Sequence, residues 1–184
     1  MASQSSSSSV DLITDQQQQD ESFMKRAIEL SRQACSPSHG CNHPFGALLL
    51  DHSTQTILLE AENTVITEQD KTKHAELNLC SMASRRFSRE YLSEKCTLYT
   101  STEPCIMCSG AIFWVGIGRV VYACSAQKLR EIVSRKQKGE NEKTSGSLTL
   151  GCHEIFEERS KGLKVQVVGP VLEEEAAAVH EEYW

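Results

Sequence analysis

Two short groups of residues in this chain have the types and spacing to hold a metal ion. His74 and Glu76 lie two residues apart, and Cys105 and Cys108 follow Pro104 in a Cys-x-x-Cys pattern. Residues three apart share one face of a helix, and thiolates at a helix N-terminus are stabilised by the unpaired backbone N–H groups there. Redox dithiols, zinc sites and packed core cysteines all produce Cys-x-x-Cys, so this motif alone leaves the chemistry open.

The upstream histidine narrows these alternatives. One His with two Cys is a ligand set of catalytic zinc, which keeps a fourth position for water, whereas a structural site usually has a fourth protein ligand. Alone, a glutamate on an exposed helix is usually a solvated charge, and a histidine is more often a satisfied core residue than a ligand. The occurrence of both groups in one chain favours the catalytic interpretation.

The pattern His-x-Glu followed by Pro-Cys-x-x-Cys resembles the cytidine deaminase-like superfamily of zinc-dependent nucleobase and nucleoside deaminases. The similarity is to the branch that contains guanine deaminases, cytosine deaminases and tRNA adenosine deaminases, and it extends over residues 23–123. Further motifs support it, namely Pro44-Phe45-Gly46-Ala47, Asn63, the run 100–105 and the run 109–112. The resemblance implies that His74, Cys105 and Cys108 bind Zn²⁺ and that Glu76 is the catalytic acid/base.

The chemistry implied by this resemblance is hydrolytic removal of an exocyclic amine as ammonia. Zinc lowers the pKa of a bound water toward neutrality, which provides the nucleophile. Glu76 would take the proton of that water, pass it to the ring nitrogen and later protonate the departing ammonia.

Substrate contacts are implied by the same resemblance. Asn63 offers an amide, Ala75 offers its backbone, and Phe45, Trp114 and Trp184 offer aromatic walls. Phe45 and Trp114 are equally at home in a hydrophobic core, and Asn63 is also typical of a turn. Because Trp184 follows Tyr183 after a polar helix, we expect this aromatic pair to form either a lid over the substrate or a dimer contact.

The identity of the substrate is open at this level. The Pro-Phe-Gly-Ala motif and Trp114 are more similar to guanine deaminases than to cytosine deaminases. The chain lacks the Gly-Phe-Asp-Asp stretch typical of those guanine enzymes and has Leu148-Thr149-Leu150-Gly151-Cys152 after a polar loop. We therefore expect a free nucleobase or nucleoside that is guanine-like, guanosine-like or cytosine-like.

Two alternatives remain. A tRNA adenosine deaminase would need a basic rim, for which the candidates are Arg85, Arg86, Arg89, Lys128, Arg130, Arg135, Lys136 and Lys138. Against it, residues 172–184 hold five glutamates and no Lys or Arg, which makes tRNA the less favoured partner. An inactive zinc-bound scaffold for partner binding would be expected to lose the acid/base residue, and Glu76 is present.

The elements that must position these residues alternate between helices and strands. Apolar spacing predicts helices over 23–34, 72–86, 106–115, 126–135 and 172–180, and strands over 45–50, 57–61, 96–101, 119–123 and 164–168. Residues 139–147 are expected to form a polar loop. This pattern predicts a three-layer α/β/α sandwich in which helices cover both faces of a central mixed five-stranded sheet, as the resemblance also implies.

Composition sets the outer limits. The chain has 184 residues, of which 39% are hydrophobic and 24% charged, so it is neither wholly disordered nor a membrane bundle. The first 20 residues are rich in Ser and Gln and predict a disordered tail before a deaminase domain at 21–184. The tail lacks the features of a secretory or organellar leader, so we expect a cytoplasmic protein, with the nucleus as the alternative.

The net charge of −6 argues against a surface built as a whole for nucleic acid. Six cysteines lie outside the metal motif, and we expect them to be reduced and to pack as small apolar residues; they are Cys35, Cys41, Cys80, Cys96, Cys124 and Cys152. The resemblance also implies a homodimer, in which a neighbouring subunit helps to complete the active-site loops.

Overall fold

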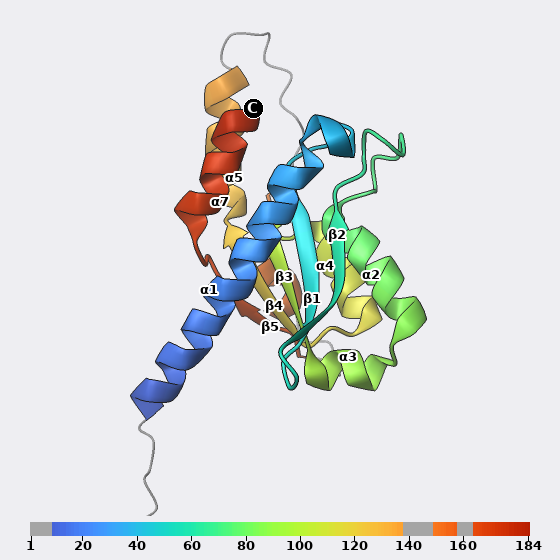
Figure 1. Cartoon of the computed structure of the whole chain (residues 1–184), viewed down its shortest axis with the longest axis vertical. Coiled ribbons are helices and arrows are strands. Elements are labelled where there is room, and N and C mark those ends of the chain that lie inside the picture. The colour runs from blue at the N-terminus through green and yellow to red at the C-terminus, as the bar shows by residue number, and fades with distance from the viewer. Residues whose placement is uncertain (1–8, 138–148, 158–163) are drawn as a thin grey trace, which may run out of the picture.

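A computed structural model describes residues 9–137, 149–157 and 164–184. The strands are β1 (Gly46–Asp51), β2 (Thr56–Glu62), β3 (Cys96–Thr102), β4 (Arg119–Cys124) and β5 (Gln166–Val168). The helices are α1 (Ser9–Ala34), α2 (Ala75–Arg86), α3 (Arg89–Lys95), α4 (Ile106–Val115), α5 (Ala126–Gln137), α6 (Cys152–Glu157) and α7 (Glu173–Tyr183), with a short 3-10 helix η1 (Pro37–His39) after α1. Figure 1 shows their arrangement around the sheet.

The five strands form one mixed sheet in the order β2-β1-β3-β4-β5. β1 is antiparallel to both β2 and β3, whereas β3, β4 and β5 run parallel to one another. Because Ala47 at the start of β1 pairs with Thr100 near the end of β3, the first residues of β1 and the carboxyl ends of β3 and β4 lie at the same edge. This edge is where open α/β sheets usually bind ligands.

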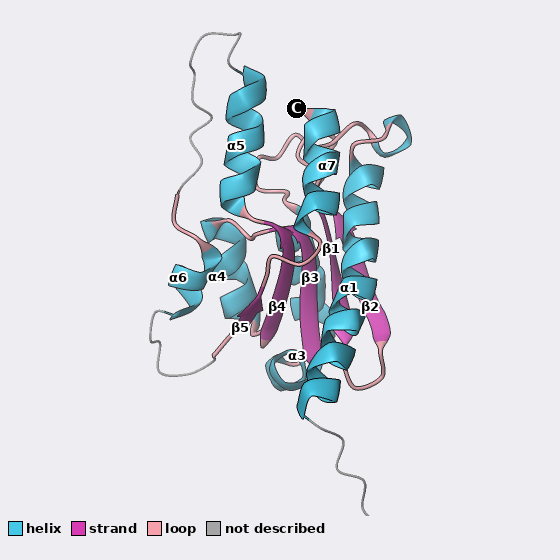
Figure 2. Ribbon diagram, turned by 90° about the vertical axis from the view of Figure 1, so that its left-hand side faces the viewer, coloured by secondary structure: helices cyan, strands magenta, loops and turns pink. Residues whose placement is uncertain are grey.

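Alternate side chains of β1 point into two separate cores. Ala47 and Leu49 pack in the core that contains residues of α2 and α4, and Leu48 and Leu50 pack in the core that contains residues of α1, α5 and α7. All six residues of β1 are buried, as expected for a strand covered by helices on both faces (Figure 2). The predicted three-layer α/β/α sandwich with a mixed five-stranded sheet is therefore confirmed.

The first helix is longer than the sequence predicted. α1 begins at Ser9, so residues 9–20, which we expected in a disordered tail, are helical; residues 1–8 of that tail lie outside the described residues. Asp20 explains the difference, because its buried carboxylate accepts hydrogen bonds from Arg119 at 2.9 and 2.6 Å and from Tyr99 at 2.7 Å. The polar composition of this segment hid a contact that only the folded chain provides.

Other differences from the sequence-based elements are small. α3 and α6 were not predicted, because seven and six residues are too few to show a clear helical period. α2 begins at Ala75 and not at Thr72. The predicted polar loop at 139–147 lies outside the described residues, and none of the helices that are described is long and apolar enough to cross a membrane.

Candidate metal centre and active site

The three candidate ligands lie at the starts of two helices. His74 is the residue that immediately precedes α2, and Cys105 holds the same N-cap position before α4, with Cys108 in its first turn. Both cap residues have extended backbones, and neither side chain makes a capping hydrogen bond. The His74 and Cys105 side chains are thus free to meet each other, and unpaired N–H groups of both helix starts lie nearby.

The distances between these side chains fit a zinc ion. The Sγ atoms of Cys105 and Cys108 lie 3.6 and 3.7 Å from Nδ1 of His74, and the three ligand atoms all lie within 4.8 Å of one another. A tetrahedral ion about 2.3 Å from sulfur and about 2.05 Å from nitrogen separates those atoms by about 3.6 Å. The donor set and its spacing therefore match Zn²⁺, and three protein ligands leave one position for a water or substrate.

Glu76 is the carboxylate beside this cluster. It is 5% exposed, and one of its oxygens accepts a hydrogen bond from Cys108 Sγ at 3.6 Å. Burial, together with the negative charge of the Cys105 thiolate, raises the pKa of Glu76 above its ordinary value. A buried carboxyl group with a raised pKa is suited to take up and release a proton near neutral pH.

The two thiols have opposite proton affinities when no cation lies between them. The hydrogen bond from Cys108 lowers the pKa of Cys105 to about 4, with a further contribution from His74. The same hydrogen bond and burial raise the pKa of Cys108. Without metal the pair therefore holds one proton, which a bound zinc ion displaces because it takes both sulfurs as thiolates.

Of the predicted substrate residues, Asn63 lies in the loop between β2 and α2, and Ala75 is the first residue of α2. Asn63 is 1% exposed, its backbone N–H donates to the Phe45 carbonyl at 3.0 Å, and its side-chain oxygen accepts from Val65 N at 3.1 Å. Asn63 is therefore a turn residue, but its amide nitrogen has no partner among the described residues. Ala75 is fully buried between His74 and Glu76 at the first position of α2.

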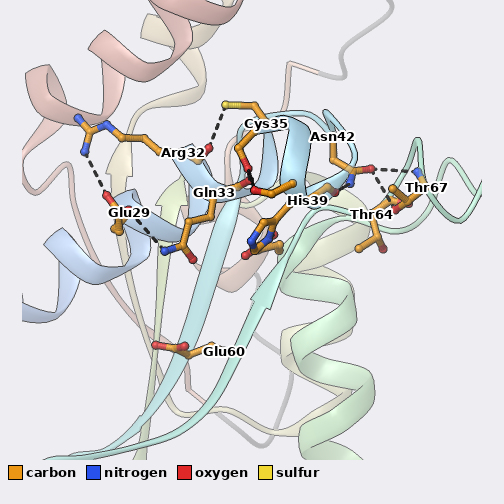
Figure 3. A network of polar contacts seen from close by, with 12 residues as sticks. Glu29, Arg32, Gln33, Cys35, His39, Asn42, Glu60, Thr64 and Thr67 are labelled. Atoms are coloured by element: carbon orange, nitrogen blue, oxygen red, sulfur yellow. Dashed lines mark hydrogen bonds and ion pairs between the residues drawn. The ribbon is translucent and has the colours of Figure 1, made fainter.

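The loop between β2 and α2 is fixed from the turn that follows α1. The side-chain oxygen of Asn42 accepts hydrogen bonds from the backbone N–H groups of Ile66 at 2.9 Å and Thr67 at 3.1 Å. The Asn42 side-chain nitrogen donates to the His39 carbonyl at 2.9 Å (Figure 3). Because Asn42 is 1% exposed, this network holds together two loops that flank the metal centre.

The end of α7 meets the residues just before β1. His43 Nδ1 lies 3.0 Å from the Tyr183 hydroxyl, and the His43 ring stacks on Trp184 with centroids 5.4 Å apart. Burial lowers the pKa of His43, and the charges of Lys71 and His74 lower it further. Trp184 thus packs on the residue that precedes the Pro-Phe-Gly-Ala motif, and its buried indole Nε1 has no partner in the described part of the chain.

His180 lies one turn before Trp184 on the same face of α7. Its Nε2 atom lies 2.9 Å from the hydroxyl of Thr102, at the end of β3, and its ring is 5.2 Å from that of Phe45. Phe45 therefore contacts α7 and also packs against the core that contains residues of α2 and α4. Neither His43 nor His180 was predicted from the sequence. His43 could have been found, because it directly precedes the Pro-Phe-Gly-Ala motif.

Trp114 was predicted to stack on the substrate, but its own chain does not bring it to the candidate metal centre. It is 78% exposed and lies nine residues after Cys105, about 13 Å further along α4. Its carbonyl accepts a hydrogen bond from Arg89 at the start of α3, at the end of the sheet opposite to the metal centre. The Trp114 side chain faces solvent, whereas Ile112 and Val115 on either side of it pack in the core.

Glu103 supports the metal loop and was also missed as a candidate residue. It lies two residues before Cys105, and its carboxylate accepts hydrogen bonds from the backbone N–H groups of Ala126 at 2.9 Å and Cys152 at 3.0 Å. These are the first residues of α5 and α6. One carboxylate thus joins the metal loop to two helix N-termini.

Comparisons with known proteins agree with this site. Residues 17–124 match the cytidine and deoxycytidylate deaminase zinc-binding region. The chain is 36% identical to a probable cytosine deaminase of Schizosaccharomyces pombe over 171 residues, covering 93% of this chain and 96% of the relative. It is 32% identical to a tRNA-specific adenosine deaminase of Haemophilus influenzae over 158 residues, covering 80% and 88%.

A solved structure supports the fold. The guanine deaminase of Nitrosomonas europaea superposes with a TM-score of 0.70 at 24% identity, covering 89% of this chain and 83% of that one. The matched zinc-binding region contains all three ligands found in the structure as well as Glu76. This chain therefore belongs to the cytidine and deoxycytidylate deaminase zinc-binding family.

Proposed function

We propose that the protein hydrolyses the exocyclic amine of a free nucleobase or nucleoside and releases ammonia. The substrate class is guanine-like, guanosine-like or cytosine-like. The observation that carries this proposal is the buried Glu76 beside a His74, Cys105 and Cys108 cluster of zinc dimensions. A scaffold that had lost activity would have no need to keep a carboxylate in so unfavourable a position.

The chain's own residues supply proton transfer and positioning. Zinc, when bound by His74, Cys105 and Cys108, lowers the pKa of a water to near neutrality. The Glu76 carboxylate would take one proton from that water and give it to the ring nitrogen. It would then carry a second proton, from the hydroxyl group added to the ring, to the amine, which leaves as ammonia while the ring carbonyl forms. The Trp184 indole N–H is a buried donor without a partner among the described residues, so it can bind an acceptor atom of a nucleobase, and the Asn63 amide offers a second donor.

The aromatic contacts at the end of α7 favour a small substrate. His43, Tyr183 and Trp184 pack against one another at the end of α7. As the predicted lid over the substrate, this cluster would leave less access for a folded RNA loop than an open surface would. The basic residues proposed for an RNA rim are partly neutralised, because Lys128 pairs with Glu174 at 3.0 Å and Arg135 with Glu181 at 2.6 Å. Each basic residue that is paired with a glutamate in this way attracts phosphates less strongly.

Deamination of adenosine in tRNA is the second candidate. It is favoured by the similarity to the Haemophilus influenzae tRNA-specific adenosine deaminase over most of both chains. The two candidates differ in which substrate is turned over, so one assay separates them.

The test is ammonia release by the zinc-loaded protein. We expect turnover of at least one among guanine, guanosine, cytosine and cytidine. Adenine, adenosine, an RNA stem-loop that has an unpaired adenosine and a matched loop without one are the comparisons, and turnover of adenine or adenosine alone would contradict the proposed substrate class. Turnover of the RNA alone would replace the proposal with the second candidate, and no turnover of any substrate would leave the scaffold.

Variants connect the activity to the site. Glu76→Gln should keep zinc and lose about 10²- to 10⁴-fold in kcat, the usual contribution of general acid–base catalysis. Cys105→Ala should lose zinc and activity together. Glu94→Gln, at an exposed position of α3, is the matched control and should change neither. A fully active Glu76→Gln protein would contradict the mechanism.

We also propose a cytoplasmic homodimer. The large exposed surface of Trp114 supports association, because an exposed tryptophan beside Phe113 is costly in water and typical of a contact surface. A partner subunit could then use Trp114 even though its own chain does not.

A further inference from the structure

The cysteines outside the metal centre fall into two groups. Cys80, Cys96, Cys124 and Cys152 are buried, as expected for packing residues. Cys41 is exposed and Cys35 is half-buried, so the packing prediction is wrong for these two. Both belong to the turn that joins α1 to β1, and the proposed deaminase chemistry does not use them.

The backbone of this turn brings the two residues together. The N–H of Asn42 donates to the Ala34 carbonyl at 2.9 Å, and the N–H of Cys41 donates to the Ser36 carbonyl at 3.0 Å. The two carbonyls that accept these bonds belong to the residues on either side of Cys35. The returning chain at Cys41 and Asn42 therefore lies against the backbone on either side of Cys35.

The side chains also share a neighbour. Cys35 Sγ donates to the Arg32 carbonyl at 3.2 Å and leaves its own lone pairs free. Burial raises the pKa of Tyr183, and the Cys35 and Cys41 thiols raise it further.

We propose that Cys35 and Cys41 are an oxidisable dithiol, a modification site that forms an intramolecular disulfide. The oxidant is a low-molecular-weight disulfide such as oxidised glutathione. The exposed Cys41 thiolate attacks one glutathione sulfur and releases a glutathione thiolate; the Cys35 thiolate then attacks Cys41 Sγ and releases the second. Two protons and two electrons leave the protein, and oxidised glutathione becomes two reduced glutathiones.

The position of this pair connects the modification to the end of α7. His43 follows Cys41 by two residues and accepts or donates the hydrogen bond to Tyr183 that holds the end of α7. A disulfide would fix the turn from which His43 extends.

Peptide mass analysis tests the pair directly. Trypsin releases residues 33–71 as one peptide that contains Cys35 and Cys41 and no other cysteine. After the zinc-loaded protein is treated with oxidised glutathione and then alkylated, we expect this peptide to lose the mass of two hydrogens and to carry no alkyl group. The reduced protein should give the doubly alkylated peptide.

Variants provide the controls. Cys35→Ser keeps a hydroxyl donor for the Arg32 carbonyl, and in this protein Cys41 should stop at the mixed disulfide with glutathione. The four buried cysteines should be alkylated only after denaturation. If oxidised wild-type protein gives the doubly alkylated peptide, or glutathione stays on Cys41 of the wild type, the proposal is wrong. This readout needs no enzymatic activity, so its failure is distinct from failure of the proposed function.

Discussion

The ion pair between Asp20 and Arg119 predicts how firmly α1 is bound to the sheet. Both carboxylate oxygens of Asp20 accept from Arg119, and the two side chains are only 6% and 15% exposed. Asp20→Asn keeps the shape but leaves the Arg119 charge buried without a counter-charge. Removing one partner of a buried pair lowers the free energy of unfolding by about 3–5 kcal/mol. Because Arg119 is partly exposed, we expect the lower end of this range, about 3 kcal/mol. For a chain of this size that lowers Tm by about 6–12 °C.

The chain provides a matched control on the same helix. Arg26 of α1 makes an equally short pair with Glu60 of β2, at 2.7 and 2.8 Å, but the side chains are 36% and 34% exposed. Glu60→Gln should therefore cost only about 0–1 kcal/mol. Both variants are measured by thermal and urea unfolding of the zinc-loaded protein. Equal losses for the two variants would refute the argument that burial of Asp20 binds α1 to the sheet.

Three further predictions concern the end of α7 and the exposed end of α4. Burial lowers the pKa of His180 to about 4, below its value of about 6.5 in the unfolded chain. Between these two values the unfolded chain binds the proton and the folded chain does not, so the free energy of unfolding should fall by about 3 kcal/mol as the pH drops from above 6.5 to 4. His180→Phe should lose this acid dependence when unfolding is measured as a function of pH. Trp184→Phe keeps the stacking ring but removes the indole N–H, so KM should rise about 3- to 10-fold while kcat and zinc content hold; an unchanged KM would exclude this contact. Trp114→Glu should convert the proposed dimer into a folded monomer in light scattering, and a wild-type monomer would contradict the dimer.

Much of the fold was predictable because the strands and helices carry strong local signals. The run 106–115 is almost entirely apolar, and the structure has α4 at the same bounds. α1 was predictable only from Phe23 onward, because the residues before it carry no apolar face. Asp20 stabilises that part of the helix through Arg119, a residue 99 positions away, and such a contact leaves no periodic signal in the sequence.

The site shows the same division between local and distant information. His74, Glu76, Cys105 and Cys108 stand in two short motifs, so their residue types and spacing were sufficient to predict that they meet. Trp114 carried the same kind of motif information, but it lies too far along α4 from the ligands. His43 contacts Tyr183, and His180 of α7 contacts Phe45, so each contact joins residues more than 100 positions apart and follows no spacing rule.

The placement of the ligands at helix starts explains how one small centre tolerates several negative groups. Two thiolates and the Glu76 carboxylate carry three negative charges around one divalent cation, which leaves an excess of one. The N-termini of α2 and α4 both point at this cluster, and their unpaired N–H groups and dipoles offset part of that excess. A capping side chain at position 74 or 105 would bind these N–H groups and reduce the positive potential at the cluster. His74 and Cys105 make no capping hydrogen bond, so the N–H groups stay available to the negative ligands. We therefore expect zinc binding to stabilise the first turns of α2 and α4, and these turns to stabilise the bound zinc ion.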